Sequence, residues 1–457
     1  MAKPSLPPGT RDFSAEVVRK RNYLLNSIRA VFESYGFGPL ETPAMEQLDT
    51  LMGKYGEEGD KLIFKILNNG LDNPEKEKQT REALEYVLKG KNSKDLTERA
   101  LRYDLTIPFA RYVATWHQQL TLPFKRYQIQ PVWRADRPQR GRYREFYQCD
   151  VDVVGSRSLL NELELGCICH AVLTKLHLPD YSLRVNHRQL LVALAAACAD
   201  RSQLGIISNA IDKLDKIGLE KVKQELAHKG LTTEQIDIIT AYLNVSGSLS
   251  QQLEQLEALL GQQPEGVIAL KELRQLILEL QEQQVNAILD PTLARGLNYY
   301  TGTIFEIKAP ARVQMGSIGG GGRYDDLTGL FGVPGIPGVG LSFGVDRIYD
   351  VLEELQLFPQ ESAQGTKVLF FNLGVEESRA AFAQLQALRE RGIASELYPE
   401  SVKFDKQFKY AEKRNISYIA IIGKEEIAQQ QVNIKNIRSG EQRTLPWKEL
   451  MTLSFTW

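Results

Sequence analysis

The spacing of apolar residues changes along the 457-residue chain, and this change constrains the fold more than any other feature of the sequence. Strand-like runs flank a polar loop between residues 123 and 155, and helical spacing takes over from 188 to 285. Strand-like runs then return, and after residue 366 short strand-like and helical runs alternate. Because a chain of this length holds two to four domains at about 150 residues each, the pattern predicts several domains rather than one.

The same pattern locates the parts of the fold. We predict an antiparallel hairpin at 123–155, an inserted helical domain at 188–285 and a compact α/β domain at 366–457. Residues 68–99 are dense in charge and poor in large apolar groups, so they form either an inserted helical hairpin or a mobile excursion.

Composition excludes several classes of protein. The longest apolar run, Leu190 to Ala199, is far shorter than the roughly 20 residues that span a bilayer, so we expect no membrane insertion. The N-terminus MAKPSLPPGTRDF lacks the apolar core of a secretion signal, and the four cysteines suit a reducing compartment, so we expect a cytoplasmic location. The net charge is −1, so any nucleic-acid footprint must be local.

Common nucleotide and metal motifs are missing from the sequence. There is no P-loop, no H-E-x-x-H and no C-x-x-C pair. Cys167, Cys169 and His170 lie close together in a predicted helix, but residues two apart point in opposite directions, so the thiols cannot share one ion. We therefore predict no metal site made by the protein's own side chains.

The strongest local signal is a basic segment at residues 125–144. It holds seven arginines and lysines against one acid, Asp136. Such a run suits a polyanion, either the phosphates of ATP or the end of an RNA. The alternative is a solvated surface loop, since most charge runs face water.

Polar side chains also interrupt apolar runs near expected strand ends. They are Asp104 and Thr106 in LRYDLTIPFARY, Gln148 and Asp152 in QCDVD, and Tyr299 and Tyr300 in RGLNYY. Asp150 and Asp152 are two residues apart and so share one face of a strand. A buried carboxylate needs a partner, which an ammonium or imidazole ligand would provide; pairing with local arginines is the structural alternative.

Arg347 lies where a glycine-rich strand runs into a helix in GLSFGVDRI. A cation near a helix N-terminus is unfavourable with the helix dipole unless an anion also binds there, which indicates a phosphate site. The preceding run Gly319–Gly322 indicates a strand that needs close backbone approach.

Together these segments resemble the signature motifs of class II aminoacyl-tRNA synthetases, and their strings resemble the histidyl-tRNA synthetase family. The matching strings, in order, are LPPGTRDF, LRYDLTIPFARY, RADRPQRGRYREFYQCDVDVVG, ARGLNYYTGTIFE, GGGGRYDDL and GLSFGVDRI. The resemblance implies an α+β fold with an antiparallel-sheet catalytic core flanked by helices. The core would comprise residues 1–187 and 286–358, interrupted by the inserted helical domain 188–285, with residues 366–457 as an α/β anticodon-binding domain.

The resemblance also implies roles for the polar residues. Arg134 would hold the α-phosphate of ATP, Arg142 and Arg347 would bind the rest of the nucleotide, and Arg295 would face both the α-phosphate and the carboxylate of histidine. The histidine-binding residues would be Asp104, Thr106 and Gln148 for the amino group, with Asp152, Tyr299 and Tyr300 around the imidazole. Asn298 departs from the family's usual aspartate, which leaves the geometry beside Arg295 less certain.

Partners follow from the same resemblance. A homodimer is expected because Pro43 falls in the segment that matches the dimer-forming first motif. The expected reaction joins L-histidine to tRNA(His) with ATP, through a histidyl adenylate, with Mg²⁺ accompanying the nucleotide. Candidate tRNA contacts are Gln139 and Arg144 in the basic segment and Lys403 and Lys406 in a basic helical stripe, which is otherwise a solvated helix face.

Two other functions compete with this interpretation. A non-catalytic regulator that binds histidine, such as the regulatory subunit of ATP phosphoribosyltransferase, resembles the family but lacks the anticodon-binding domain. A class II synthetase for proline or threonine would need a different side-chain pocket, and the string RGLNYYTG and the acid Asp152 disfavour it.

Overall fold

The computed structural model describes residues 4–52, 60–198, 201–294, 299–363 and 365–455. It divides into two compact units. One unit takes most of the chain up to Leu357, and the other takes Phe358 to the C-terminus together with Asp12–Tyr23. Within the described residues, no helix is long and apolar enough to cross a membrane.

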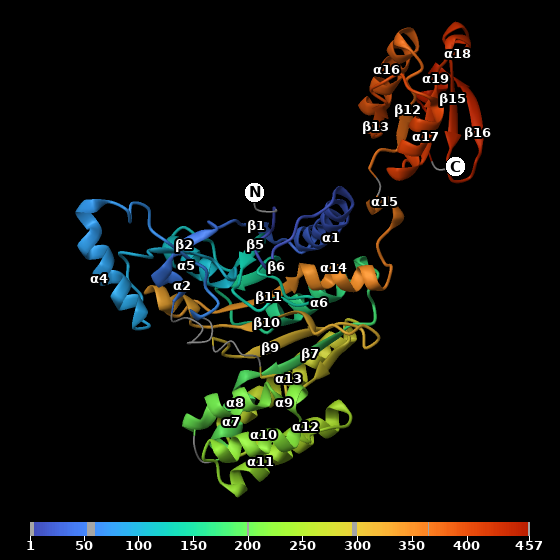
Figure 1. The fold of residues 1–457 in the computed structure, drawn as a ribbon. Helices are drawn as coiled ribbons and strands as arrows, with labels where there is room; N and C mark the ends of the chain where they lie inside the picture. Colours follow the sequence, from blue (N-terminus) through green and yellow to red (C-terminus); the bar gives the residue numbers. More distant parts are fainter. Residues whose placement is uncertain (1–3, 53–59, 199–200, 295–298, 364, 456–457) are drawn as a thin grey trace. The chain divides into compact units, whose positions relative to one another are not determined.

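The first unit is built on an eight-stranded sheet (Figure 1). In spatial order its strands are β1 (Gly38–Pro39), β5 (Phe124–Trp133), β6 (Glu145–Val154), β11 (Gly338–Gly344), β10 (Ser317–Arg323), β9 (Thr303–Lys308), β7 (Ser182–His187) and β8 (Ala287–Leu289). In this spatial order, the six strands from β5 across to β7 pair antiparallel with one another, as predicted. The two edge strands, β1 and β8, pair parallel with their neighbours, so the complete sheet is mixed.

The predicted hairpin at 123–155 is confirmed as β5 and β6, and its register gives the sheet two different faces. Cys149, Val151 and Val153 are almost fully buried on one face. On that face Phe32 of helix α1 (Ala15–Ser34) contacts the rings of Tyr127 and Phe343. Because side chains alternate along a strand, the residues between these apolar ones point to the opposite face, and several of them are polar.

Further helices and a second, small sheet complete this unit. The helices outside the inserted segment are α2 (Leu48–Leu51), α4 (Glu77–Leu88), α5 (Thr106–Trp116), α6 (Leu160–Lys175) and α14 (Val345–Glu354), with single 3₁₀ turns at Pro74–Lys76 and Leu327–Phe331. The small sheet has the order β2 (Met45–Gln47), β4 (Arg99–Leu101) and β3 (Lys65–Ile66). The charged stretch 68–99 therefore contains one helix, α4, rather than a helical hairpin.

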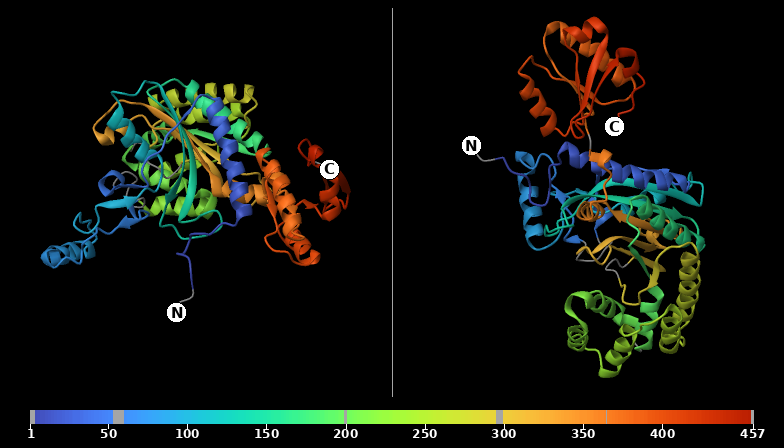
Figure 2. Two further views of the ribbon diagram at one scale, coloured as in Figure 1. Left: turned by 90° about the horizontal axis from the view of Figure 1, so that it is seen from above. Right: turned by 90° about the vertical axis from the view of Figure 1, so that its right-hand side faces the viewer.

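The segment predicted as an inserted helical domain is helical. Its elements are α7 (Arg188–Ala197), a 3₁₀ turn (Arg201–Gln203), α8 (Leu204–Ile211), α9 (Leu214–Ile217), α10 (Leu219–His228), α11 (Thr233–Leu243), α12 (Leu249–Leu260) and α13 (Pro264–Glu282). Two views show them gathered beside one edge of the sheet (Figures 1 and 2). They belong to the same compact unit as the sheet, so the domain boundaries at 188 and 285 stay a prediction.

The second unit alternates strands and helices, as predicted. Its elements are α15 (Gln360–Ala363), β12 (Val368–Phe370), α16 (Val375–Glu390), β13 (Ser395–Leu397), α17 (Phe404–Lys413), β14 (Tyr418–Ile421), α18 (Lys424–Gln429), β15 (Gln431–Asn436), β16 (Gln442–Pro446) and α19 (Trp447–Leu450). The five-stranded sheet has the order β13-β12-β14-β15-β16. Apolar clusters cover both of its faces, because successive residues of β12 alternate between Val368 and Phe370 on one face and Leu369 on the other.

Glycines hold β10 close to β11, as the run Gly319–Gly322 predicted. A Cβ added at Gly321 would lie 1.9 Å from the carbonyl oxygen of Gly340, a backbone atom that cannot rotate away. We expect Gly321→Ala to lower the free energy of unfolding of this unit by about 1–3 kcal/mol, the usual cost of overpacking. Scanning calorimetry of the full chain measures this as a lower unfolding temperature.

Gly205→Ala is the matched control for this prediction. Gly205 lies exposed in α8 with nothing within 4 Å of an added Cβ, so alanine should be neutral or stabilise the helix by up to about 1 kcal/mol. Equal unfolding temperatures for the two variants would contradict the close approach of the two strands.

Candidate active site

A cavity of about 660 Å³ opens on the polar face of the eight-stranded sheet. The β5–β6 hairpin, strands β10 and β11, and the first turns of α5 and α14 supply its walls. The predicted site residues that line it are Asp104, Thr106, Arg134, Arg142, Gln148, Asp152, Tyr299, Tyr300 and Arg347. Arg295 and Asn298 lie outside the described residues. Segments that are far apart in the sequence therefore meet in one cavity.

Backbone carbonyl oxygens anchor two of the arginines that line the cavity. The Arg134 side chain donates from Nε to the Tyr103 carbonyl oxygen at 2.8 Å, with its guanidinium 5.2 Å from the Phe146 ring centroid. Arg347, in the first turn of α14, donates from Nε to the Gly141 carbonyl oxygen at 2.8 Å and from Nη1 to that of Ser317. These bonds anchor both guanidinium groups in the wall of the cavity, where each can contact an anionic ligand.

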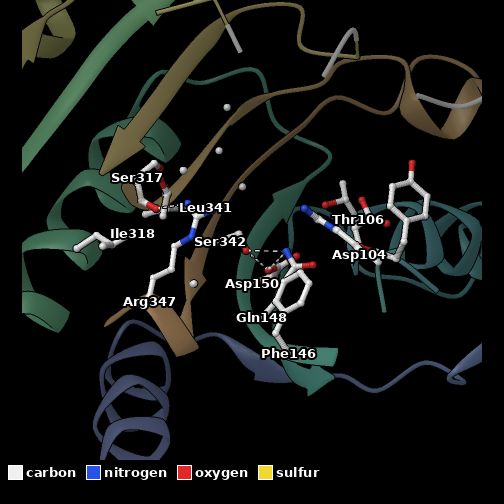
Figure 3. A pocket seen from close by; sticks show the side chains of 18 of the residues that line it. Asp104, Thr106, Phe146, Gln148, Asp150, Ser317, Ile318, Leu341, Ser342 and Arg347 are labelled. Carbon is white, nitrogen blue, oxygen red and sulfur yellow. Dashed lines mark hydrogen bonds between the residues drawn. The ribbon is translucent and has the colours of Figure 1, made fainter. Parts of the chain in front are cut away.

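Carboxylates line the cavity as well, and Asp104 lies on the side opposite Arg347. Figure 3 shows Arg347 beside Ser317 on one side, Asp104 and Thr106 on the other, and Gln148 and Asp150 between them. Asp104 is 4% exposed just before α5, and its Oδ1 accepts the Ile107 backbone N–H at 3.3 Å. Burial raises the pKa of Asp104 to about 6, although the nearby Arg134 opposes the rise. A cationic ligand group on this side would compensate the burial of this carboxylate.

Asp150 and Asp152 form the floor of the cavity, on the same strand face as predicted. Burial raises the pKa of both carboxyl groups, that of Asp150 to about 7, while Arg126 opposes both shifts. Tyr324 donates its hydroxyl to Asp152 Oδ1 at 2.5 Å, and the Ser342 hydroxyl donates to Asp150. The floor is therefore a network of buried acids held by hydroxyl groups.

Comparisons with known proteins agree over nearly the whole chain. The family model described as "Histidyl-tRNA synthetase" matches residues 75–348, and that described as "Anticodon binding domain" matches residues 368–453. A curated histidine--tRNA ligase of Christiangramia forsetii is 49% identical over 451 residues, which cover 98% of each chain. That of Bacteroides fragilis is also 49% identical, over 455 residues and 98% of each chain. The chain belongs to the histidyl-tRNA synthetase family. A crystal structure of histidyl-tRNA synthetase from Nostoc sp. PCC 7120 has a TM-score of 0.81 at 30% identity and covers 99% of this chain and 100% of that one.

In this member of the family the inserted helices are tied to the cavity by hydrogen bonds. Gln189 of α7 donates its side-chain amide to the Thr301 carbonyl oxygen at 2.9 Å, next to Tyr300. Tyr242 of α11 donates its hydroxyl to the Pro291 carbonyl oxygen at 2.9 Å. Asn209 of α8 itself lines the cavity. The inserted helices therefore support the wall that carries the two adjacent tyrosines of the family motif.

None of the predicted tRNA-contact residues is among the residues that line the cavity. Gln139 is exposed and pairs with Arg142 in an isolated bridge. Arg144 is half-buried, and its Nε donates to the Asp136 carbonyl oxygen at 3.1 Å. In the second unit, Lys403 and Lys406 are exposed at the start of α17. Their role in binding tRNA stays a prediction.

Sequence reasoning missed three residues that shape this histidyl-tRNA synthetase site. They are Tyr324, Ser342 and Arg126, which contact the floor carboxylates. Arg126 and Lys125 belong to the basic segment at residues 125–144, but both lie in strand β5 rather than in a loop. Lys125 pairs with Glu164 outside the cavity. The sequence does contain a signal for Arg126, because it is a charged residue within the strand-like run FKRYQIQPVW. A charge buried in a strand needs a partner of opposite charge nearby.

The three arginines that line the cavity, Arg134, Arg142 and Arg347, predict that it binds a polyphosphate. Arg142 is about half exposed, and its ion pair with Asp136 is long, at 3.8 Å. Replacing Arg142 therefore removes a charge with little effect on folding. We expect Arg142→Met to weaken the affinity for inorganic triphosphate about five- to tenfold in isothermal titration calorimetry.

Arg140→Met is the matched control, because Arg140 lies in the same loop but pairs with Glu354 and does not line the cavity. It should change the affinity less than about twofold. If both variants lose affinity equally, the loop acts only through its net charge and the cavity is not the phosphate site.

Proposed function

We infer that this chain is a histidine--tRNA ligase, which joins L-histidine to tRNA(His) and converts ATP to AMP and pyrophosphate through a histidyl adenylate. Membership of the family over the whole chain, at 49% identity to curated ligases, is the observation that carries this function. The cavity supports it, because both arginines and carboxylates line it, which suits a nucleotide and an amino acid held side by side.

The first step needs orientation and charge rather than a general base. The carboxylate of free histidine is already ionised at neutral pH and attacks the α-phosphorus of ATP directly. We propose that Arg134, and Arg295 beyond the described residues, stabilise the charge that develops on the α-phosphate, with Arg142 and Arg347 on the rest of the nucleotide. The pyrophosphate leaves, and the histidyl group then moves to the terminal ribose of the tRNA.

Histidine would be recognised at both of its nitrogen-bearing ends. In this proposal Asp104, Thr106 and Gln148 receive the amino group. Support comes from Gln148, whose Nε2 donates to Ser342 Oγ at 2.9 Å, while its Oε1 has no hydrogen-bond partner within the described part of the chain. Asp152, with Tyr299 and Tyr300 nearby, would read the imidazole, whose two ring nitrogens have distinct donor and acceptor roles.

Magnesium belongs to the nucleotide in this proposal. Among the described residues, no group of three or more His, Cys, Asp or Glu side chains is placed to hold a metal ion. We therefore treat Mg²⁺ as part of the ATP substrate and assign it no site made by the protein.

We also propose a homodimer, in line with the match of Pro43 to the dimer-forming motif of the family. Exposed apolar side chains near that segment support it, since Met45 on β2 is 52% exposed. Light scattering on the purified chain should give twice the mass of one chain. A monomer that is fully active would contradict the proposal.

Histidine-dependent exchange of pyrophosphate into ATP tests the function most directly. We expect exchange with histidine alone among the twenty amino acids, because a carboxylate and tyrosines can distinguish imidazole from isosteres. Exchange with proline or threonine would indicate another class II synthetase.

The regulatory alternative makes the opposite prediction for the same assay. A folded protein that binds histidine in calorimetry but supports no exchange with any amino acid would be a non-catalytic relative.

A further inference from the structure

Arg126 is a fully buried cation that the proposed reaction does not use. It lies in β5 directly opposite Asp152 of β6 in the strand register. Its Nη2 is 2.8 Å from Asp152 Oδ2, and its guanidinium is 4.0 Å from the centroid of the Phe109 ring. The side chain therefore lies on the same face of the sheet as Asp152, between an aromatic ring and the carboxylate.

A second buried arginine shows what a purely structural role looks like in this chain. Arg102 is 1% exposed and donates to the carbonyl oxygens of Thr42, Pro43 and Pro131 and to Gln130. None of the three Arg126 nitrogens makes a well-aligned hydrogen bond within the described residues; the contact with Asp152 is one of charge and distance. The interactions that the structure gives Arg126 are therefore electrostatic, with the Asp152 carboxylate and the Phe109 ring.

The Asp152 carboxylate is held from other directions as well. Tyr324 donates its hydroxyl to Oδ1 at 2.5 Å. Gly340 lies opposite Asp152 on β11, where an added Cβ would stand 1.9 Å from Oδ1. The carboxylate thus has one position, and a side chain at residue 340 would displace it.

The charges at the floor do not balance without Arg126. Asp150 and Asp152 are 2% and 3% exposed, and the charge of Asp152 raises the pKa of Asp150 further. The groups that shift Asp152 are Arg126 and Tyr324, while Arg126, Asp152, Ser342 and Asp104 act on Asp150. Arg126 is the one cation among these neighbours. Its loss would raise the pKa of both buried carboxyl groups, so that the two would not both be ionised.

We propose that Arg126 is a positioning residue for amino-acid selection, which keeps Asp152 ionised and fixed so that it accepts an N–H of the imidazole of histidine. This inference rests on the proposed function. Arg126 touches neither substrate; it acts through Asp152. Its removal should impair the binding of histidine and leave the nucleotide end of the cavity unchanged.

The test is Arg126→Met in the full chain, with the Michaelis constants for histidine and ATP measured by pyrophosphate exchange. We expect the KM for histidine at pH 7 to rise about 10- to 100-fold, as for loss of a contact to a charged group, while the KM for ATP stays within about twofold. Arg126→Lys retains the charge and should fall between the variant and the wild type.

The pH profile distinguishes this role from a structural one. Without Arg126 the pKa of Asp152 rises further, so a larger fraction of the variant than of the wild type has Asp152 protonated at a given pH, and a higher pH restores the carboxylate. The ratio of the histidine KM of Arg126→Met to that of the wild type should therefore fall as the pH increases above neutral. Taking the ratio cancels the titration of histidine itself.

Lys125→Met is the matched control, because the same change of charge occurs one residue earlier on the opposite face of β5, where Lys125 pairs with Glu164. It should change either KM less than about twofold. If Arg126→Met raises both KM values alike, or if its ratio to wild type does not change with pH, the inference is wrong. If the wild type itself activates no histidine, the proposed function fails instead.

Tyr324→Phe keeps the test decisive if Arg126→Met does not fold. It removes one hydroxyl from the other side of Asp152 and preserves the ring that packs in the core. We expect a smaller rise in the histidine KM, about tenfold, with the KM for ATP unchanged. An unchanged histidine KM would show that the fixed carboxylate does not read the amino acid.

Discussion

The cavity depends on two close approaches at positions without side chains. A Cβ at Gly321 would collide with the backbone of Gly340, and a Cβ at Gly340 would collide with the side chain of Asp152. Gly321 therefore lets β10 and β11 pair closely, and Gly340 leaves room for the Asp152 carboxylate of β6. The position of the buried acid depends on the absence of a side chain on the neighbouring strand.

Charged side chains of both signs line the cavity. Arg134 and Arg347 are anchored through backbone carbonyl oxygens, whereas Asp104 and the floor acids are buried and pushed toward protonation. In the proposed function, an amino acid would place its carboxylate toward the arginines and its ammonium toward Asp104. Such a site would orient its substrate before any reaction occurs, which is the main requirement when the nucleophile is already ionised.

Much of this arrangement was predictable from the sequence, and the exceptions share one cause. The hairpin 123–155, the helical segment after Arg188 and the α/β unit follow from hydrophobic spacing, and the polar residues at strand ends do line one cavity. Arg126 and Tyr324 were missed because their roles depend on strand register and on which strands are neighbours, and periodicity alone determines neither. The parallel pairing of β1 and β8 was missed for the same reason, since both are very short edge strands.

The hydrogen bonds between the inserted helices and the cavity wall have a consequence for engineering. Gln189 and Tyr242 reach carbonyl oxygens on either side of the segment that leads to Tyr300, and Leu293 packs on that ring. A chimera that exchanges the inserted helices between relatives would have to transfer these donors together with the loop that accepts them. The helices and the loop form one module for recombination, although they are far apart in the sequence.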